Sequence, residues 1–152
     1  MKKLFLLVAL LISAFSHAET EFDRALIKEG IVDAQYRVIN DKALDEVLRG
    51  VTNKVAHMFP SRIDAYTTIF SVNINRFGIY TNYQLDEVET KKDAEYILYN
   101  FGLAQDYKNY LCSSEFAGSE TFRKLNAKFH LNFLNSERSV IYTLKIPMSS
   151  CK

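Results

Sequence analysis

Hydrophobic positions recur at helical spacing along some stretches of the chain and alternate with polar ones along others. The clearest helix is predicted for residues 41–58, whose apolar side chains fall within an arc of about 100° on a helical wheel. Asn40 or Asp41 can cap its start, and Pro60 enforces its end because proline cannot continue a helix. The apolar positions are Leu44, Val47, Leu48, Val51, Val55 and Met58. This helix is expected to pack one face on a core.

Three further helices are predicted, and one segment is ambiguous. Thr20, with Asp23 three residues later, resembles a capping box at a helix start. Residues 31–39 alternate apolar and polar side chains, which favours a strand, although tertiary context could make them helical. The further helices are expected from Glu21 to near Gly30, from about Thr90 to Leu111, and from Ser119 to Asn126.

Alternation with a period of two predicts two β-hairpins. Residues 75–78 turn the first hairpin, where Gly78 can adopt a positive φ, and residues 135–138 turn the second. The alternating residues are Phe70, Val72 and Ile74, then Ile79, Thr81, Tyr83 and Leu85; later Phe129, Leu131 and Phe133, then Val140, Tyr142, Leu144 and Ile146. This order predicts an α+β fold, an antiparallel sheet of four or five strands packed against helices. How the two hairpins join is left open.

Residues 1–18 are typical of a secretory signal peptide. Lys2 and Lys3 form a short positive region, an apolar stretch runs from Leu4 to Ile12, and Ser16-His17-Ala18 is a small-x-small cleavage signal. The apolar stretch is too short to span a bilayer, so no membrane insertion is expected after cleavage before Glu19. The expected product is one α+β domain, residues 19–152, in a bacterial periplasm; a secreted product is the alternative.

Two cysteines remain after the leader, Cys112 and Cys151. In an oxidising compartment they are predicted to form a disulfide that joins the long helix to the end of the last strand. Closing a loop of about forty residues in this way stabilises the fold by roughly 4 kcal/mol in the chain-entropy model. The wide spacing lacks the Cys-x-x-Cys arrangement of redox-active pairs, so the role is structural.

Charge excludes several classes of partner. Removing residues 1–18 takes away Lys2 and Lys3, which lowers the 19 basic residues to 17 against 18 acidic ones, a net charge of −1. The charges are interspersed, without the basic stripe that nucleic-acid binding needs for counterion release. Nucleic acid is therefore not expected as a partner, and since no metal or nucleotide motif stands in the sequence, no metal or cofactor is expected either.

Catalytic motifs are not found in the sequence. His57 and His130 are both predicted on polar faces, as solvated surface histidines, and neither Gly-x-Ser-x-Gly nor Ser-x-x-Lys occurs. Asp86, Glu87 and Glu89 could serve a carboxylate-based cell-wall hydrolase. Their ordinary explanation is that acidic side chains near a helix start complement its dipole. The protein is expected not to be an enzyme.

Two aromatic features are candidate contact surfaces. On a wheel of the long helix, Ile97, Phe101, Ala104 and Leu111 form one apolar stripe, and Tyr96, Tyr99, Leu103, Tyr107 and Tyr110 form a second. Tyrosine gives contact area at low entropic cost, so the second stripe is a candidate interface; alternatively the rings pack beneath neighbouring helices. Arg76 and Phe77 occupy the tip of the first hairpin. Phe77 is either an exposed interface anchor or folds back over the sheet edge.

These observations favour non-catalytic binding of another protein in the periplasm or envelope. The first hypothesis is an inhibitor or immunity protein, with Arg76, Phe77, Tyr96, Tyr99, Tyr107 and Tyr110 as contacts. The alternative is an accessory subunit of a secretion, pilus or sensory complex of the envelope. A third hypothesis is the carboxylate-based hydrolase, which would lack an identifiable nucleophile, base or metal.

Overall fold

The computed structural model describes residues 19–151, so the predicted signal peptide lies outside the described residues. The fold is α+β, as predicted, with helices packed on a five-stranded sheet. The helices are α2 (Glu21–Lys28), α3 (Asp41–Ala56), α4 (Lys91–Asn100), α5 (Leu103–Cys112), α6 (Glu115–Gly118) and α7 (Glu120–Lys124), with a 3-10 turn η2 (Met148–Ser150). The strands are β1 (Ser61–Arg62), β2 (Thr67–Asn75), β3 (Gly78–Leu85), β4 (Lys128–Leu134) and β5 (Val140–Pro147). Both predicted hairpins are confirmed.

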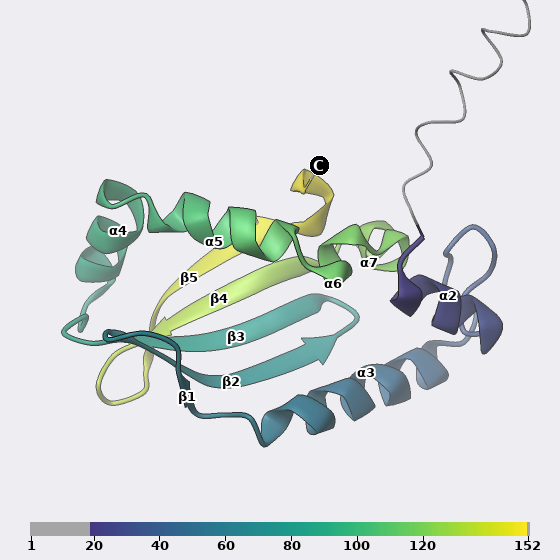
Figure 1. The fold of residues 1–152 in the computed structure, drawn as a ribbon, viewed down its shortest axis with the longest axis horizontal. Coiled ribbons are helices and arrows are strands. Elements are labelled where there is room, and N and C mark those ends of the chain that lie inside the picture. The colour runs from purple at the N-terminus through teal and green to yellow at the C-terminus, as the bar shows by residue number, and fades with distance from the viewer. Residues whose placement is uncertain (1–18, 152) are drawn as a thin grey trace, which may run out of the picture.

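The strands lie in the order β1-β2-β3-β4-β5, and three of the four pairings are antiparallel. The exception joins the two hairpins: β4 runs parallel to β3, with Gly78 opposite Lys128 and Gln84 opposite Leu134. The chain makes this connection through α4–α7, which carry it back to the end of the sheet where β3 began (Figure 1). The sheet is therefore mixed, although mostly antiparallel.

Gly78 is the residue that allows β4 to lie so close to the first hairpin. Its φ is +142°, and a Cβ atom there would lie 1.8 Å from the carbonyl oxygen of Lys128. The backbone of Lys128 donates to the carbonyl of Phe77 at 3.0 Å, which fixes the start of the parallel pairing. The predicted turn glycine thus serves two purposes, because it closes the hairpin and leaves room for the next strand.

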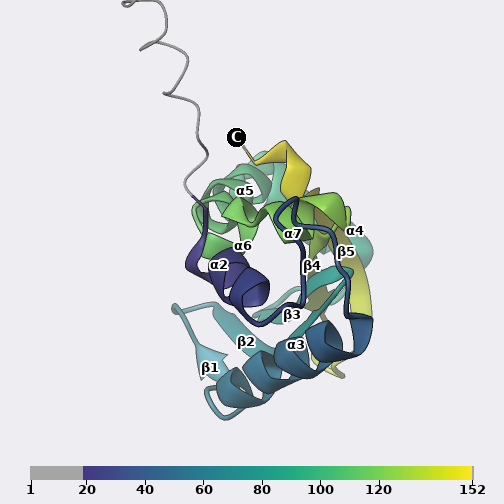
Figure 2. The same ribbon diagram turned by 90° about the vertical axis from the view of Figure 1, so that its right-hand side faces the viewer.

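The core lies between one face of the sheet and the helices: α2 and α4–α7 form a layer over that face, and α3 adds Leu44 and Leu48 from its place along β2 (Figures 1 and 2). Its largest fully buried side chains include Leu26, Leu44, Leu48, Leu98, Phe122, Phe129, Leu131, Phe133 and Met148. Helix α3 packs along β2, where Thr52 bonds to both backbone groups of Ile74. The opposite face of the sheet is polar: side-chain hydrogen bonds run across it from Ser71 through Asn82 and Asn132 to Thr143.

Asp23 ties α2 to the start of α7. Thr20 caps α2 by accepting from the backbone of Asp23, as predicted. The Asp23 carboxylate does not complete the box, because it accepts instead from the Ser119 hydroxyl and from the backbone of Glu120 and Thr121. Asp23 is fully buried, so these three bonds replace the water that the carboxylate loses.

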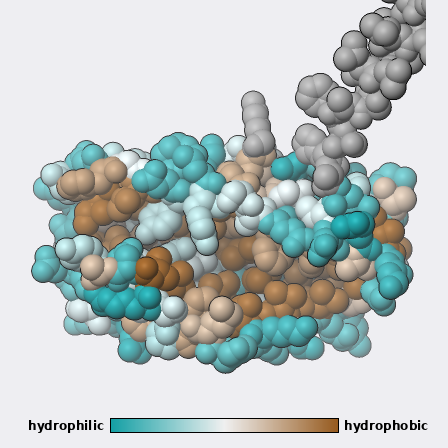
Figure 3. Space-filling model, viewed as in Figure 1, coloured by the Kyte–Doolittle hydropathy of each residue, from teal (hydrophilic) through white to brown (hydrophobic). Residues whose placement is uncertain are grey.

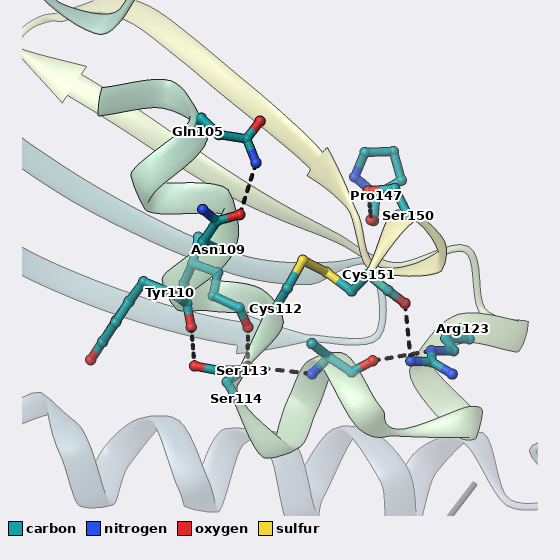
Figure 4. Close-up of a disulfide and its surroundings, with 12 residues drawn as sticks. Gln105, Asn109, Tyr110, Cys112, Ser113, Ser114, Arg123, Pro147, Ser150 and Cys151 are labelled. Carbon is teal, nitrogen blue, oxygen red and sulfur yellow. Dashed lines mark hydrogen bonds between the residues drawn. A yellow bond between two sulfur atoms is a disulfide. The ribbon is translucent and has the colours of Figure 1, made fainter. Parts of the chain in front are cut away.

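The disulfide between Cys112 and Cys151 is confirmed, with 5.1 Å between the Cα atoms (Figure 4). It joins the end of α5 to the residue after η2. Arg123 supports the same corner by donating to the carbonyl oxygens of Ala117 and Cys151, at 3.1 and 3.3 Å. Within residues 19–151, no helix has the length and apolar character needed to cross a bilayer.

Two local predictions are wrong. The single helix expected over 90–111 is two helices, because Gly102 adopts a left-handed conformation with φ 73° and separates α4 from α5. The strand favoured for 31–39 reduces to one bridge, between Val32 and Val38. Asp33 explains the second difference, since its carboxylate accepts from the backbone of Gln35 and Arg37 and stabilises a turn there.

Candidate protein-binding trough

The main hollow lies between α5 and the loop that joins β1 to β2. A first cavity of about 430 Å³ is lined by Ile63, Asp64, Ile69, Tyr83, Leu103, Asp106, Tyr107 and Tyr110. A second, of about 650 Å³, is lined by Asp64, Tyr66, Thr67, Leu85, Asp86, Glu87, Ile97, Phe101, Leu103 and Tyr107. Asp64, Leu103 and Tyr107 belong to both linings, so the two cavities form one continuous trough. Figure 3 shows hydrophobic residues reaching the surface on this side of the molecule.

Aromatic side chains form both the rim and the floor of the trough. Tyr66, Phe101 and Tyr110 stand on the rim and expose 71%, 66% and 76% of their surface. Tyr107 and Tyr83 form the floor, with ring centroids 5.4 Å apart. Burial raises the pKa of both floor tyrosines, so their hydroxyls stay protonated and can donate hydrogen bonds. Rigid aromatic rings with polar tips are the usual anchors of protein interfaces.

Local sequence explains how each wall is positioned. Gly102 ends α4 and re-aims the chain, so that α5 begins at Leu103 and presents Tyr107 and Tyr110 toward β2 and β3. On the other wall, Asp64 accepts from the backbone of Tyr66 and Thr67 at 2.7 and 2.8 Å. These hydrogen bonds lower the pKa of Asp64, which keeps the carboxylate charged and the turn that carries Tyr66 fixed.

The ionisable residues that line the trough are acidic apart from its tyrosines. They are Asp64, Asp86, Glu87 and Asp106. Arg62 is a basic neighbour of two of them: it donates to Asp86 at 2.7 Å, and its charge also helps to lower the pKa of Asp64. The trough therefore combines an apolar floor with a negative rim, which matches an apolar segment that carries basic residues at its ends.

The structure places the predicted tyrosines in two groups. Tyr107 and Tyr110 line the trough. Tyr99 lies outside it, with its hydroxyl 2.9 Å from that of Tyr142 on β5, and Tyr96 packs edge-on against Phe101. The hydrogen bond between these two hydroxyls is the main reason that the pKa of Tyr142 is raised, to about 12. The break at Gly102 explains the division, since the predicted stripe assumed one uninterrupted helix.

Arg76 and Phe77 are at the other end of β3 from the trough. Phe77 is 65% exposed, so it does not fold back over the sheet edge. Arg76 is held on α3, where it donates to the carboxylates of Asp41 and Asp45 at 2.6 and 2.8 Å. These partners raise the pKa of Arg76 further. The hairpin tip is thus a rigid projection that carries one exposed aromatic ring.

Two of the three candidate catalytic carboxylates, Asp86 and Glu89, have structural partners, and Glu87 lines the trough. Asp86 pairs with Arg62, and Glu89 accepts from the backbone and hydroxyl of Ser136 at 3.1 and 2.9 Å. His130 stacks on Tyr80 on the polar face of the sheet, with ring centroids 4.2 Å apart. Among residues 19–151, no three His, Cys, Asp or Glu side chains are grouped closely enough to hold a metal ion.

Sequence reasoning missed one wall of the trough and most of its floor. Ile63 and Tyr66 lie in a loop, where two apolar residues between a proline and a strand were an available signal. Ile69 was missed because a bulge between Ile69 and Ser71 shifts the register, so that Ile69, and not Phe70, lies opposite Tyr83. Tyr83 and Leu85 were predicted to share one face of a strand, and their alternation alone does not show that this face borders a trough.

No family model matches the chain, and no curated protein matches it in sequence. Solved structures do match. A candidate secreted protein from Pseudomonas aeruginosa, PA3611, superposes with a TM-score of 0.55 at 12% identity, over 76% of this chain and 99% of that one. The two chains share a fold. Pilotins of type II secretion systems also match: EpsS from Vibrio vulnificus, with a TM-score of 0.49 at 11% identity over 74% and 94% of the two chains, and AspS from Vibrio cholerae, with 0.40 at 8% over 73% and 94%.

Proposed function

We propose that this protein is a non-catalytic accessory subunit of an envelope complex, with its trough holding an apolar segment of a partner protein. The observation that carries the proposal is the concave aromatic surface itself. Tyr66, Phe101 and Tyr110 are exposed around a trough with a half-buried to buried floor, and such a patch in a water-soluble domain marks a binding site. The periplasm is the proposed location, with secretion as the alternative.

The shape of the site favours an accessory subunit over an inhibitor. An inhibitor that blocks an enzyme usually inserts a projecting element into the cleft of its target. Here the trough, which is the larger of the two aromatic surfaces, is concave, and a concave surface is suited to receive a segment of a partner. The negative rim, with Asp64 and Asp106 on either side of the apolar floor, favours a segment flanked by lysine or arginine.

A photo-crosslinking amino acid at position 110, introduced in intact cells, tests this proposal. Crosslinking to a membrane-associated component of a secretion, pilus or sensory complex is the expected result. Tyr110→Ala should weaken binding of that component about tenfold or more, as loss of an interface anchor does, with an unchanged melting temperature. The same crosslinker at exposed Glu46 on α3 is the matched control. The trough would be refuted as the site if position 110 gave no crosslinked product, or if position 46 captured the same component equally well.

A second candidate function rests on the hairpin tip. Phe77 is exposed on a projection that the Arg76 ion pairs and Gly78 hold rigid, which is the form an inhibitor or immunity protein would use. A crosslinker at position 77 tests it in the same cells. Capture of one soluble enzyme at 77, together with no product at 110, would support the inhibitor and displace the accessory subunit.

A further inference from the structure

The outer edge of β5 is open. β5 is the last strand of the sheet, and within residues 19–151 it pairs only with β4. Met148 donates its backbone N–H to the carbonyl of Ala127, and the antiparallel register continues from that pair. Because hydrogen-bonded pairs alternate along an antiparallel ladder, the backbone groups of Leu144 and Ile146 point to β4. Those of Thr143 and Lys145 point outward, away from the sheet.

The opposite edge of the sheet is protected in a way that β5 is not. There β1 covers the start of β2, and Thr52 on α3 bonds to both backbone groups of Ile74. Proteins commonly cover or charge exposed edges, because an open row of N–H and C=O groups is a template for another strand. On β5, the protecting features are the single charge of Lys145, the bulge near Val140 and Pro147, which ends the strand without an N–H to offer.

Two hollows follow this open edge, one beside each half of β5, and together they are called the edge groove. One hollow of about 330 Å³ is lined by Lys91 and by residues 140–143 of β5. Another, of about 360 Å³, is lined by residues 144–147 and by Leu98, Tyr99, Gly102, Ala104, Gln105, Lys108 and Ser150. All eight residues of β5 therefore line one hollow or the other. An extended segment laid along β5 would find apolar surface beside it at Ala104 and Leu144.

The charges in this groove all have one sign. Lys91, Lys108 and Lys145 line it, and none of the described residues that line it is acidic. Lys145 is exposed, and Lys91 meets only the surface carboxylate of Glu95, at 3.5 Å. A second copy of this chain paired edge to edge would bring two such sets of lysines together, which like-charge repulsion opposes. An acidic strand has the complementary charge.

We propose that the outer edge of β5 binds an extended, acidic segment of a partner protein by β-strand addition. Main-chain hydrogen bonds to Thr143 and Lys145 supply affinity, and the three lysines select acidic side chains. This site is separate from the trough, since the two linings have no residue in common, although α4 and α5 contribute side chains to both.

The test is selection of a phage-displayed library of random twelve-residue peptides on the full exported protein. Enriched peptides should be rich in Asp, Glu and β-branched residues and poor in proline. Lys145→Pro removes an outward N–H and leaves the hydrogen bonds to β4 intact. It should lower the affinity for a selected synthetic peptide at least tenfold, as measured by fluorescence anisotropy. Lys145→Glu should shift a repeated selection toward basic peptides. Tyr110→Ala in the trough is the matched control and should leave both results unchanged.

Three outcomes would overturn the proposal. The first is the absence of any enriched peptide, and the second is binding that survives both Lys145 variants but is lost with Tyr110→Ala. The third is a wild-type dimer in sedimentation velocity that Lys145→Pro converts to monomer, because the occupant would then be a second copy. If Lys145→Pro lowers the melting temperature sharply, the Lys145→Glu selection decides alone. A failed trough experiment would leave these results standing, so the two proposals fail separately.

Discussion

The hydroxyl of Thr52 donates to the carbonyl of Ile74 at 3.2 Å and accepts from its N–H at 2.9 Å, so one side chain of α3 satisfies both edge groups of a β2 residue. Thr52→Val keeps the shape of the side chain and removes both bonds. The free energy of unfolding should fall by about 1–2 kcal/mol, since two partly buried backbone groups lose their partner. Urea unfolding measures this change. Thr52→Ser retains the hydroxyl and should lose much less; an equal loss in both variants would contradict the hydrogen-bond explanation.

Gly78→Ala tests the close approach of β4 to the first hairpin. A Cβ atom at this position would collide with the carbonyl of Lys128, in a backbone conformation that side chains rarely adopt. The variant should lose about 3 kcal/mol or more of stability. Gly50, within α3, is the control because a Cβ there meets nothing within 4 Å. Gly50→Ala should raise stability by about 0.5–1 kcal/mol. Thermal unfolding of both variants would show opposite shifts.

Arg76 and Phe77 are expected to have separable roles. Arg76→Ala removes the ion pairs to Asp41 and Asp45 and should lower the free energy of unfolding by up to about 1 kcal/mol, because these pairs are partly exposed. High salt should reduce the difference from wild type. Phe77→Ala should leave stability unchanged, since its ring is mostly exposed. Loss of stability in Phe77→Ala alone would instead show that the ring packs on the fold.

His130 gives the protein a pH dependence of known sign. Burial first, and then the charges of Lys145 and Lys128, hold the pKa of His130 below its ordinary 6.5. Between the two pKa values the unfolded chain binds more protons than the folded one, so stability rises with pH there. The contribution is present above pH 6.5 and is lost as pH falls through the folded pKa. An NMR titration of the imidazole should show a midpoint below 6.5. Lys145→Gln should raise that midpoint. An unchanged midpoint would show that the charge of Lys145 does not lower the pKa of His130.

Local patterns in the sequence predicted most elements of the fold because those elements depend on neighbouring residues. The stripe of Leu44 and Leu48, the turn at Gly78 and the pairing of the two cysteines all follow from spacing or chemistry visible in the chain. The boundary between α4 and α5 could not be predicted in the same way. Gly102 can be tolerated inside a helix, and only tertiary packing of α4 and α5 makes it a boundary.

The candidate site was predictable only in part. Tyr107 and Tyr110 were singled out by their spacing, but Tyr66 and Ile69 come from a loop and a bulged strand, and no periodic pattern brings these next to α5. The polar roles of Arg76 and Asp23 were also hidden, because their partners lie 31–35 and 96–98 residues away along the chain. Contacts of that range are set by topology, which the two hairpins alone left open.

The parallel contact between β3 and β4 has a consequence for the order of assembly. Residue 78 meets residue 128, so the centre of the sheet cannot close until the intervening segment has arrived and folded back. Contacts that span so much chain slow the search for the native state. A polypeptide emerging from its amino end can build the first hairpin early, but it leaves one side of β3 bare until β4, Lys128–Leu134, is available. Newly made molecules should therefore pass through an interval in which that bare strand is vulnerable to aggregation or to proteases.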